Sequence, residues 1–419
     1  MHAFRKVLLL LVFLGLFGWV GYTQVNRLRI ERHLRVADEA QHRFDFDKAR
    51  EEIEACLKLR PKDANLELRL ARNFRRSGRY DEAEAHLIHC QELGGETPDS
   101  VLEFAMLKAQ QGDLLGSQNY LLTALKNDSP ESSLILEALA QGAMRIVHLG
   151  SAMTYLNQLL AREPDHVRAL FWRGQLWEGS ARVQEAEADY RKAIELQPDL
   201  LGARLQLGEL LLGLKRSDEA LEQFEHLHDI EPDNPRVILD LAKAHRILGE
   251  TQQAEELLGE LLGRYPQHRE GLIQRALIMM DAGDARRAEP LLRRALKRGP
   301  YDKEANFQVA RCLEMLGHET EAKEYRKRSK EIEDDLRALA KVIERVQKSP
   351  NDPELRRQAA VLCLHTGRNG EALKWFQGAL QIDPHHKPTH AALADYYEQM
   401  GQPDLAEPHR QAADPKTGA

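Results

Sequence analysis

The regular spacing of prolines constrains this chain more than any other feature of its sequence. Six prolines follow one another at intervals of 34 residues: Pro130, Pro164, Pro198, Pro232, Pro266 and Pro300. Proline lacks a backbone N–H and clashes with the preceding helical turn, so it ends a helix. A helix terminator that recurs at one interval predicts an array of structural repeats.

Each 34-residue block contains two amphipathic helical patterns. Apolar and small residues recur three, four or seven positions apart, as they do on one face of a helix. A short turn divides each block, for example at residues 248–251 and 282–285. Small residues such as Gly174 and Ala186 stand at fixed places, where only a small side chain lets two helices approach closely. Each block is therefore expected to form a helical hairpin.

The combination of Leu170, Gly174, Ala186, Tyr190 and Pro198 resembles the tetratricopeptide repeat family. With looser matches on both sides, about eleven units cover residues 30–415. The resemblance implies an all-α, right-handed solenoid of helix-turn-helix hairpins. It also implies that the first helices of successive repeats line a concave face, and that the partners are proteins or peptides.

One repeat is longer than the others, because Pro300 and Pro350 are 50 residues apart, or 34 plus 16. The added stretch has no glycine or proline, and its apolar residues continue one helical face: Ile332, Leu336, Leu339, Ile343 and Val346. The second helix of this repeat is expected to be longer by about four turns. It would project from the stack or brace the next repeat, and a local coiled-coil dimer seam is the alternative.

The N-terminus carries a separate hydrophobic segment. Residues 7–22 contain no charge and follow Arg5 and Lys6. A helix over residues 7–25 would be about 28 Å long, close to the ~30 Å hydrocarbon core of a bilayer. A cleaved signal peptide needs small residues before the cut, and Trp19 interrupts that pattern. The segment is therefore predicted to be an uncleaved, single-pass signal anchor.

The orientation of this anchor is less clearly indicated. Four arginines between residues 27 and 35 outnumber Arg5 and Lys6, which favours a cytoplasmic location for the downstream side. A short N-terminal tail before a lone hydrophobic segment usually stays inside the cell, which favours translocation of the large domain. An extracytoplasmic repeat domain is the expectation. The predicted organisation is a signal anchor at 1–29, a solenoid at 30–318, the extended helix at 319–349 and C-terminal repeats at 350–415.

Composition and motifs argue against catalysis, cofactors and nucleic acid. The net charge is −7 with interspersed signs, whereas a nucleic-acid face needs clustered lysine and arginine. The sequence has no GxxxxGK[ST], GxGxxG, HExxH or GxSxG motif, so no catalytic residue and no cofactor are predicted. The four cysteines form no CxxC pair and are expected to be small buried residues. His386 and His390 lie one helical turn apart, but at a repeat junction they are expected to cap helices, so no metal is predicted.

Two rows of residues could line the implied concave face. The fifth place of successive blocks is apolar: Phe171, Leu205, Leu239, Ile273 and Phe307. The sixth place is rich in amides and carries Trp172, Gln206, Asp240, Gln274 and Gln308, with Gln358 beyond the insertion. An extended peptide needs apolar pockets together with amides that bond its backbone. The alternative is that the apolar row seals neighbouring helices and the glutamines are only solvated.

Arg69, Arg72 and Arg76 share one helix face and form a candidate basic patch. Such a patch could bind an acidic partner segment or anionic lipid headgroups. It resembles the carboxylate clamp of chaperone-binding members in charge only, since the matching asparagines are missing. The alternative is that the arginine side chains simply cover the helix.

The sequence therefore predicts a membrane-anchored, non-catalytic scaffold that binds proteins or peptides, and it leaves the oligomeric state open. Its layout is similar to that of bacterial envelope-assembly scaffolds. Lipopolysaccharide-assembly regulators end in a cysteine-rich metal knuckle, and the missing CxxC argues against that assignment. A regulatory or substrate-recruiting subunit of an enzyme complex is the alternative, and an enzyme of unrecognised type is a further one.

Overall fold

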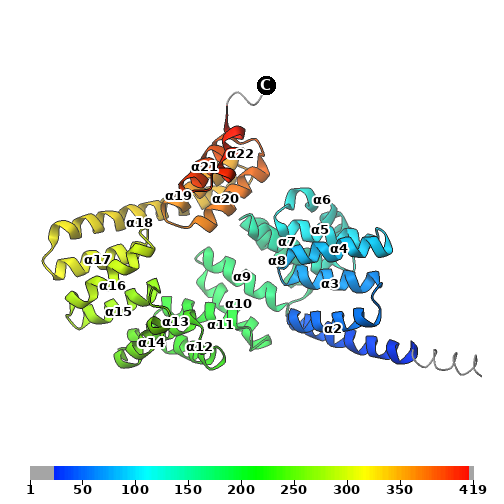
Figure 1. The fold of residues 1–419 in the computed structure, drawn as a ribbon, viewed down its shortest axis with the longest axis horizontal. Coiled ribbons are helices and arrows are strands. Elements are labelled where there is room, and N and C mark those ends of the chain that lie inside the picture. Colours follow the sequence, from blue (N-terminus) through cyan, green and yellow to red (C-terminus); the bar gives the residue numbers. More distant parts are fainter. Residues whose placement is uncertain (1–22, 415–419) are drawn as a thin grey trace, which may run out of the picture. The chain divides into compact units, whose positions relative to one another are not determined.

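The computed structural model describes residues 23–414, and every regular element in this range is an α-helix (Figure 1). Residues 23–42 are helical. The helices that follow are α2 (Phe46–Leu59), α3 (Ala64–Arg76), α4 (Tyr80–Gly94), α5 (Pro98–Gln111), α6 (Leu114–Lys126), α7 (Ser132–Arg145), α8 (Leu149–Arg162), α9 (Val167–Gly179), α10 (Val183–Leu196), α11 (Leu201–Gly213), α12 (Ser217–Ile230), α13 (Pro235–Leu248), α14 (Thr251–Arg264), α15 (Arg269–Asp281), α16 (Ala285–Arg298), α17 (Lys303–Met315), α18 (Glu319–Lys348), α19 (Pro353–His365), α20 (Asn369–Ile382), α21 (Lys387–Gln399) and α22 (Pro403–Ala413).

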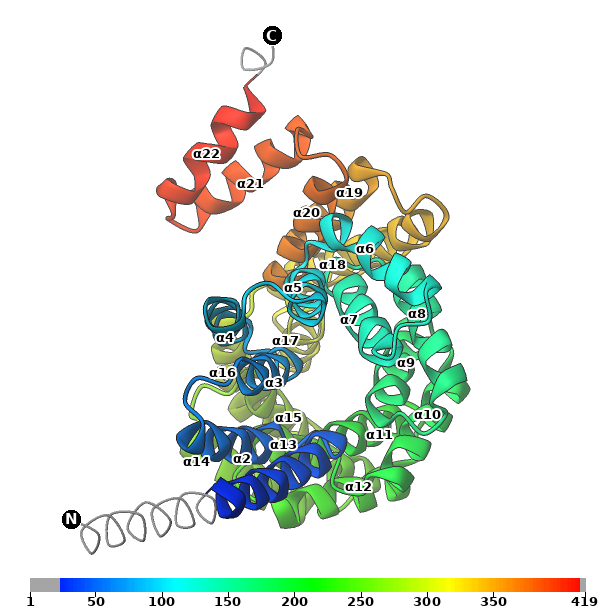
Figure 2. The same cartoon turned by 90° about the vertical axis from the view of Figure 1, so that its right-hand side faces the viewer.

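The helices form stacked hairpins in two compact units, and the boundary between the units falls within α7, between Gly142 and Ala143. In the first unit, α3 packs on α4 and α5 packs on α6. In the second unit, seven hairpins follow one another from α9/α10 to α21/α22, and the second helix of each contacts the first helix of the next (Figures 1 and 2). The prediction of an all-α array of stacked hairpins is confirmed.

The predicted membrane anchor lies almost entirely outside the described residues, because residues 7–22 of the 7–25 segment precede them. Within residues 23–414, none of the helices is both long enough and apolar enough to span a membrane.

A residue with positive φ marks the turn inside each hairpin. In the first unit these are Phe44, Gly78 and Gly112, and in the second they are Val147, Ala181, Lys215, Gly249, Gly283, Gly317, Gly367 and Gly401. The left-handed conformation at the end of a helix lets the chain reverse while its last carbonyls stay hydrogen-bonded. From Val147 to Gly317 the interval is again 34 residues, so the hairpin turns repeat with the same period as the prolines.

A side-chain hydrogen bond to a proline carbonyl recurs at the junctions between hairpins. Where the residue six places after the junction proline is polar, its side chain donates to the carbonyl of that proline. The four examples are Arg204 to Pro198 at 2.9 Å, Asn306 to Pro300 at 3.0 Å, Arg356 to Pro350 at 3.0 Å and His390 to Pro384 at 3.0 Å. At the other junction prolines of the second unit the equivalent residue is apolar and buried, as at Leu170 and Leu272, whereas in the first unit Glu67 stands six places after Pro61 and bonds His86 instead. In the second unit this place therefore either fills the core or caps the junction.

The small residues predicted to allow close helix approach do so. A Cβ atom added to Gly174 would lie 2.6 Å from Cε1 of Tyr190, and one added to Gly208 would lie 2.5 Å from Cε1 of Phe224. Both distances are too short for a real side chain, so an aromatic ring of the second helix occupies the space over each glycine.

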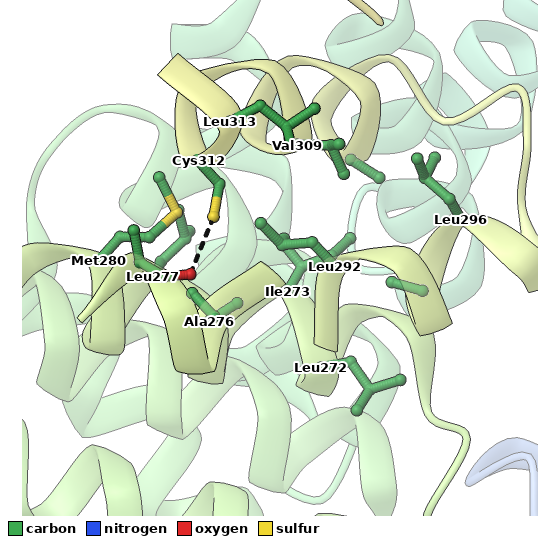
Figure 3. Packing of buried hydrophobic residues seen from close by; sticks show 14 of the residues in the cluster. Leu272, Ile273, Ala276, Leu277, Met280, Leu292, Leu296, Val309, Cys312 and Leu313 are labelled. Atoms are coloured by element: carbon green, nitrogen blue, oxygen red, sulfur yellow. Dashed lines mark hydrogen bonds between the residues drawn. The ribbon is translucent and has the colours of Figure 1, made fainter. Parts of the chain in front are cut away.

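The core of the second unit consists of several apolar clusters along the stack. Figure 3 shows one part of it, where Ile273 of α15 packs with Leu292, Val309 and Leu313 from the next helices. Cys312 belongs to the same cluster, and its Sγ donates to the carbonyl of Ala285 over 3.2 Å. All four cysteines are buried and free, as expected, and burial raises the pKa of Cys312 to about 11.

The stretch without glycine or proline forms one 30-residue helix, α18. Its second half is not a free seam, because Leu339, Val342 and Val346 are buried in a cluster with α19 and α20. This packing favours the bracing role over the coiled-coil alternative. The four-part division of the chain proposed from sequence stays a prediction.

Candidate functional site

The predicted apolar row differs in exposure along its length. Leu239 and Ile273 are buried, Phe171 and Leu205 are half-buried, and Phe307 is 38% exposed. The ring of Phe171 lies 3.5 Å from the position that a Cβ on Gly202 would take. Most of this row therefore seals one first helix against the next, and whether any part of it binds a peptide stays a prediction.

The glutamines of the sixth place all have partners inside the chain. Three of them donate to a glutamate on the same helix: Gln206 to Glu209, Gln308 to Glu304 and Gln358 to Glu354. The fourth accepts a hydrogen bond, since Arg246 Nε lies 3.0 Å from Gln274 Oε1. Trp172 is buried under the guanidinium of Arg168, which lies 4.6 Å from the ring centroid. A peptide would have to compete with these bonds, and the amide row also stays a prediction.

The arginines of the predicted basic patch pair within the first unit. Arg69 bonds Asp38 at 2.8 Å and is partly exposed, whereas Arg72 pairs with Glu103 at 3.1 Å and with Glu131 at 3.3 Å. Arg76 is 9% exposed and pairs with Glu137 at 3.1 Å. These pairs balance the positive charge of α3, which favours the structural alternative over an acidic partner.

Of the two histidines predicted to cap a junction, His390 does so, because its Nε2 bonds the carbonyl of Pro384. His386 makes no side-chain cap bond to the backbone. The other ring nitrogen of His390 lies 2.8 Å from Nδ1 of His409. No group of metal-ligating side chains occurs within residues 23–414.

A groove beside the long helix is the strongest candidate site. It has a volume of about 750 Å³ and lies within the second unit. Four segments line it: the α16–α17 turn, the middle of α18, and the first helices α19 and α21. The lining residues are Pro300, Tyr301, Arg328, Glu331, Ile332, Asp335, Val361, Leu364, His365, Ala392, Asp395, Tyr396 and Gln399. We call it the α18 groove.

The inserted length of α18 explains why the groove occurs here. First helices of neighbouring repeats contact each other directly at α11–α13, α13–α15, α15–α17 and α19–α21, whereas α17–α19, like α9–α11, shows no comparable contact among the described residues. The extra turns of α18 separate these two helices. The gap in the row of first helices leaves Tyr301 54% exposed at its edge.

The charged residues of the α18 groove are mostly acidic. Glu331, Asp335 and Asp395 line the groove together with a single guanidinium, that of Arg328, so the lining has a formal charge of −2 with His365 neutral. Glu331 also pairs with Lys327, which does not line the groove, at 3.8 Å. His365 lies 3.6 Å from Asp335. Within the described residues, Asp395 forms no ion pair. Together with the apolar side chains of Val361, Leu364 and Tyr396, these carboxylates suit a segment that carries both apolar and basic side chains.

The groove residues were not predicted from the sequence, although a signal was present. Val361, Leu364 and His365 stand at the ninth, twelfth and thirteenth places of their repeat, and Asp395 stands at the ninth place of the next. These places follow the fifth by four, seven and eight residues, so they lie on the same helix face one and two turns further along. Extending the fifth-place row by helical spacing would have found them, but the position of α18 beside them would not have followed.

Comparisons with known proteins agree with this fold. One family model described as tetratricopeptide repeat matches residues 138–200, 179–235, 273–331 and 320–387, and another with the same description matches residues 211–276. The matches of the first model alone cover more than half of the chain.

Several solved structures are similar to this chain. One is a tetratricopeptide repeat protein from Parabacteroides merdae, with 19% identity and a TM-score of 0.35 over 69% of this chain and 98% of that one. Another is MamA from Desulfovibrio magneticus, with 18% identity and a TM-score of 0.37 over 39% of this chain and 93% of that one. A search of curated proteins finds no match.

Proposed function

Because this chain belongs to the tetratricopeptide repeat family, we propose that it is a membrane-anchored, non-catalytic scaffold whose α18 groove binds a peptide segment of a partner protein. The observation that carries the proposal is the groove itself. It combines an exposed tyrosine, an apolar floor and three carboxylates at a place where two successive first helices, α17 and α19, are separated.

The carboxylates and the apolar side chains of the groove favour a partner segment that is both basic and apolar. Lysine or arginine side chains would pair with Glu331, Asp335 and Asp395, while leucine or aromatic side chains would pack on Val361, Leu364 and Tyr301. Since these carboxylates are partly solvated, each ion pair would contribute about 0.2–1 kcal/mol and weaken with salt. Apolar burial would supply the remaining affinity.

A binding experiment with labelled peptides tests this proposal. Peptides with constant leucines and tyrosines, and with lysines replaced stepwise by glutamates, would be titrated into the full-length chain in detergent. Affinity should rise with positive charge. The triple variant Glu331→Gln/Asp335→Asn/Asp395→Asn should weaken binding of the most basic peptide about tenfold, or ~1.4 kcal/mol.

A matched control removes three carboxylates from α18 outside the groove, in the variant Glu319→Gln/Glu324→Gln/Glu344→Gln. The control should change affinity less than twofold at the same ionic strength. Equal losses in both triple variants, or tighter binding of the acidic peptides, would contradict the proposal.

The anchor is proposed from residues 7–25, and the repeats are proposed to lie on the extracytoplasmic side. A protease-accessibility test on intact cells and on permeabilised cells distinguishes the two sides. If the repeats are digested once the outer barrier is opened, while the inner membrane is still intact, this orientation is supported. Protection until the inner membrane is disrupted contradicts it.

A further inference from the structure

A second, smaller cavity lies where the start of the second unit meets its C-terminal repeats. Its volume is about 200 Å³. The α7–α8 turn, the first turn of α8, the end of α18, Pro350, Arg356 of α19 and Trp375 of α20 line it. Sites for drug-sized ligands usually measure ~300–1,000 Å³, so this cavity suits a smaller molecule. None of the residues of the two predicted rows or of the α18 groove lines it.

Arg356 is a buried cation without an anion. Its side chain is 1% exposed, and its guanidinium donates to the carbonyl of Ile146 at 2.8 Å and to that of Pro350 at 3.0 Å. No carboxylate among the described residues forms an ion pair with it, and burial lowers its pKa to about 10. An uncompensated buried charge is unfavourable unless an opposite charge approaches it.

Three further features of the lining favour an anion. No lining residue is acidic, and the indole N–H of Trp375, which is 1% exposed, has no acceptor within the described part of the chain. The cavity includes the first turn of α8, where His148 at the N-cap makes no side-chain bond to the backbone N–H groups. These N–H groups and the helix dipole attract negative charge. His148 itself bonds Ser151 at 2.7 Å, and burial together with the nearby Arg356 lowers its pKa.

We propose that this cavity binds a carboxylate joined to a short aliphatic group. The single guanidinium balances one negative charge, whereas a phosphate would bring about −1.5 to −2 and leave charge uncompensated. The other half of the lining is apolar, with Val147, Leu149, Ile343 and Val346. A carboxylate would accept hydrogen bonds from Arg356, while its aliphatic group would pack on these side chains.

Two sources can provide this ligand, a free aliphatic acid or the C-terminal residue of another chain. Calorimetric titration of the full-length chain with isovalerate and with the dipeptide Gly-Val distinguishes them. Isovaleramide and the C-terminal amide of Gly-Val are the matched neutral probes. Binding of either acid, with at least tenfold weaker binding of its amide, is the expected result, and the acid that binds more tightly identifies the source.

Two variants test the site independently. Arg356→Leu removes the cation and introduces the residue that Leu170 and Leu272 provide at the same repeat position, so the fold should tolerate it. Gly150→Leu keeps Arg356 but adds a side chain to a residue that lines the cavity, at a position where a Cβ would have no atom within 4 Å. Each should weaken binding of the acid at least tenfold.

Two control variants carry the same substitutions elsewhere. Arg204→Leu removes another arginine that bonds a junction proline, and Gly259→Leu adds a side chain at an equally open helical glycine. Both should bind the acid within twofold of the parent chain. Equal binding of acid and amide, no binding of either acid up to about 10 mM, or full affinity in Gly150→Leu would overturn the proposal. Because Gly150→Leu retains the arginine, its affinity for the acid still tests the site if Arg356→Leu does not fold.

Discussion

A buried ion pair joins two first helices in the first unit, whereas the corresponding contact between α15 and α17 in the second unit has an apolar core. In the first unit, Arg75 of α3 and Glu103 of α5 are both fully buried and paired, and Arg75 also donates to Gln110 at 2.8 Å. Arg76 extends this ionic contact to Glu137 of α7. In the second unit, the buried contacts between α15 and α17 are apolar, as Figure 3 shows, and the ion pair that joins these helices, Arg311 with Asp281 at 3.6 Å, lies between exposed side chains.

The same type of hairpin can therefore be stacked through either of two kinds of contact between first helices, apolar or ionic, each of which we call a seam. An apolar seam loses stability in proportion to the volume removed. A buried ionic seam can be replaced by apolar residues at little loss, but the removal of one partner leaves a buried charge. We call the contacts of Arg75, Arg76, Glu103 and Glu137 the ionic seam.

The largest effect is expected from breaking the ionic seam on one side. Glu103→Ala leaves Arg75 buried without its carboxylate and should destabilise the first unit by about 3–5 kcal/mol. Hydrogen exchange measured by mass spectrometry reports the loss in each unit separately. Glu84→Ala is the control, because its pair with Lys108 is one-third exposed and should contribute less than about 1 kcal/mol. Similar exchange in the two variants would contradict the distinction.

An apolar deletion in the second unit should have a smaller and local effect. Leu313 is fully buried in the cluster of Figure 3, so Leu313→Ala should cost about 2–4 kcal/mol through lost burial and the cavity left behind. The increase in exchange should be confined to α15–α18 and their neighbours. Leu405→Ala, at a leucine that is 50% exposed, should change exchange very little. Loss of protection in the first unit would show that the seams are not independent.

The backbone conformation of the hairpin turns should affect stability in the same way whether the neighbouring seam is apolar or ionic. Lys215 has φ +62°, a conformation that costs a non-glycine residue roughly 1–2 kcal/mol. Lys215→Gly should therefore stabilise the second unit by about 1 kcal/mol in denaturant unfolding, after allowance for the greater chain entropy of glycine. The reverse change at the matching turn, Gly249→Ala, should destabilise by a similar amount. A stabilising Gly249→Ala would contradict the role given to these turns.

The smallest effect is expected from an exposed ion pair. Hydrogen bonding to Arg357 is the main cause that lowers the pKa of Glu354 to about 2. A lowered carboxyl pKa adds stability above the unfolded value near 4.5, and this stability is lost as the pH falls toward 2. Since Glu354 is 40% exposed, Glu354→Gln should cost less than about 1 kcal/mol at pH 7 and progressively less as the pH falls through 2. A cost that does not fall between pH 7 and pH 2 would show that the charge is not responsible.

The sequence predicted the period and the hairpins because both depend on local chemistry. Proline, glycine and small residues act on the backbone and on adjacent helices, so they repeat visibly. The ionic seam was not predictable, because Arg76 meets a glutamate 61 residues away in another hairpin. The arginines of the predicted patch, Arg69, Arg72 and Arg76, therefore looked like a basic surface. The α18 groove was missed since it depends on how far the inserted turns separate α17 from α19.

The central claim is that the inserted length of α18 opens the binding site of this scaffold. A photocrosslinking amino acid placed at Val361 of the full-length chain in cells tests this claim most directly, with the same amino acid at Gln206 as the comparison. We expect crosslinks at position 361 to a basic, apolar segment, and their loss in the triple variant of Glu331, Asp335 and Asp395. Crosslinks at position 206 but not at 361, or crosslinks at 361 that survive neutralisation of the three carboxylates, would contradict the claim.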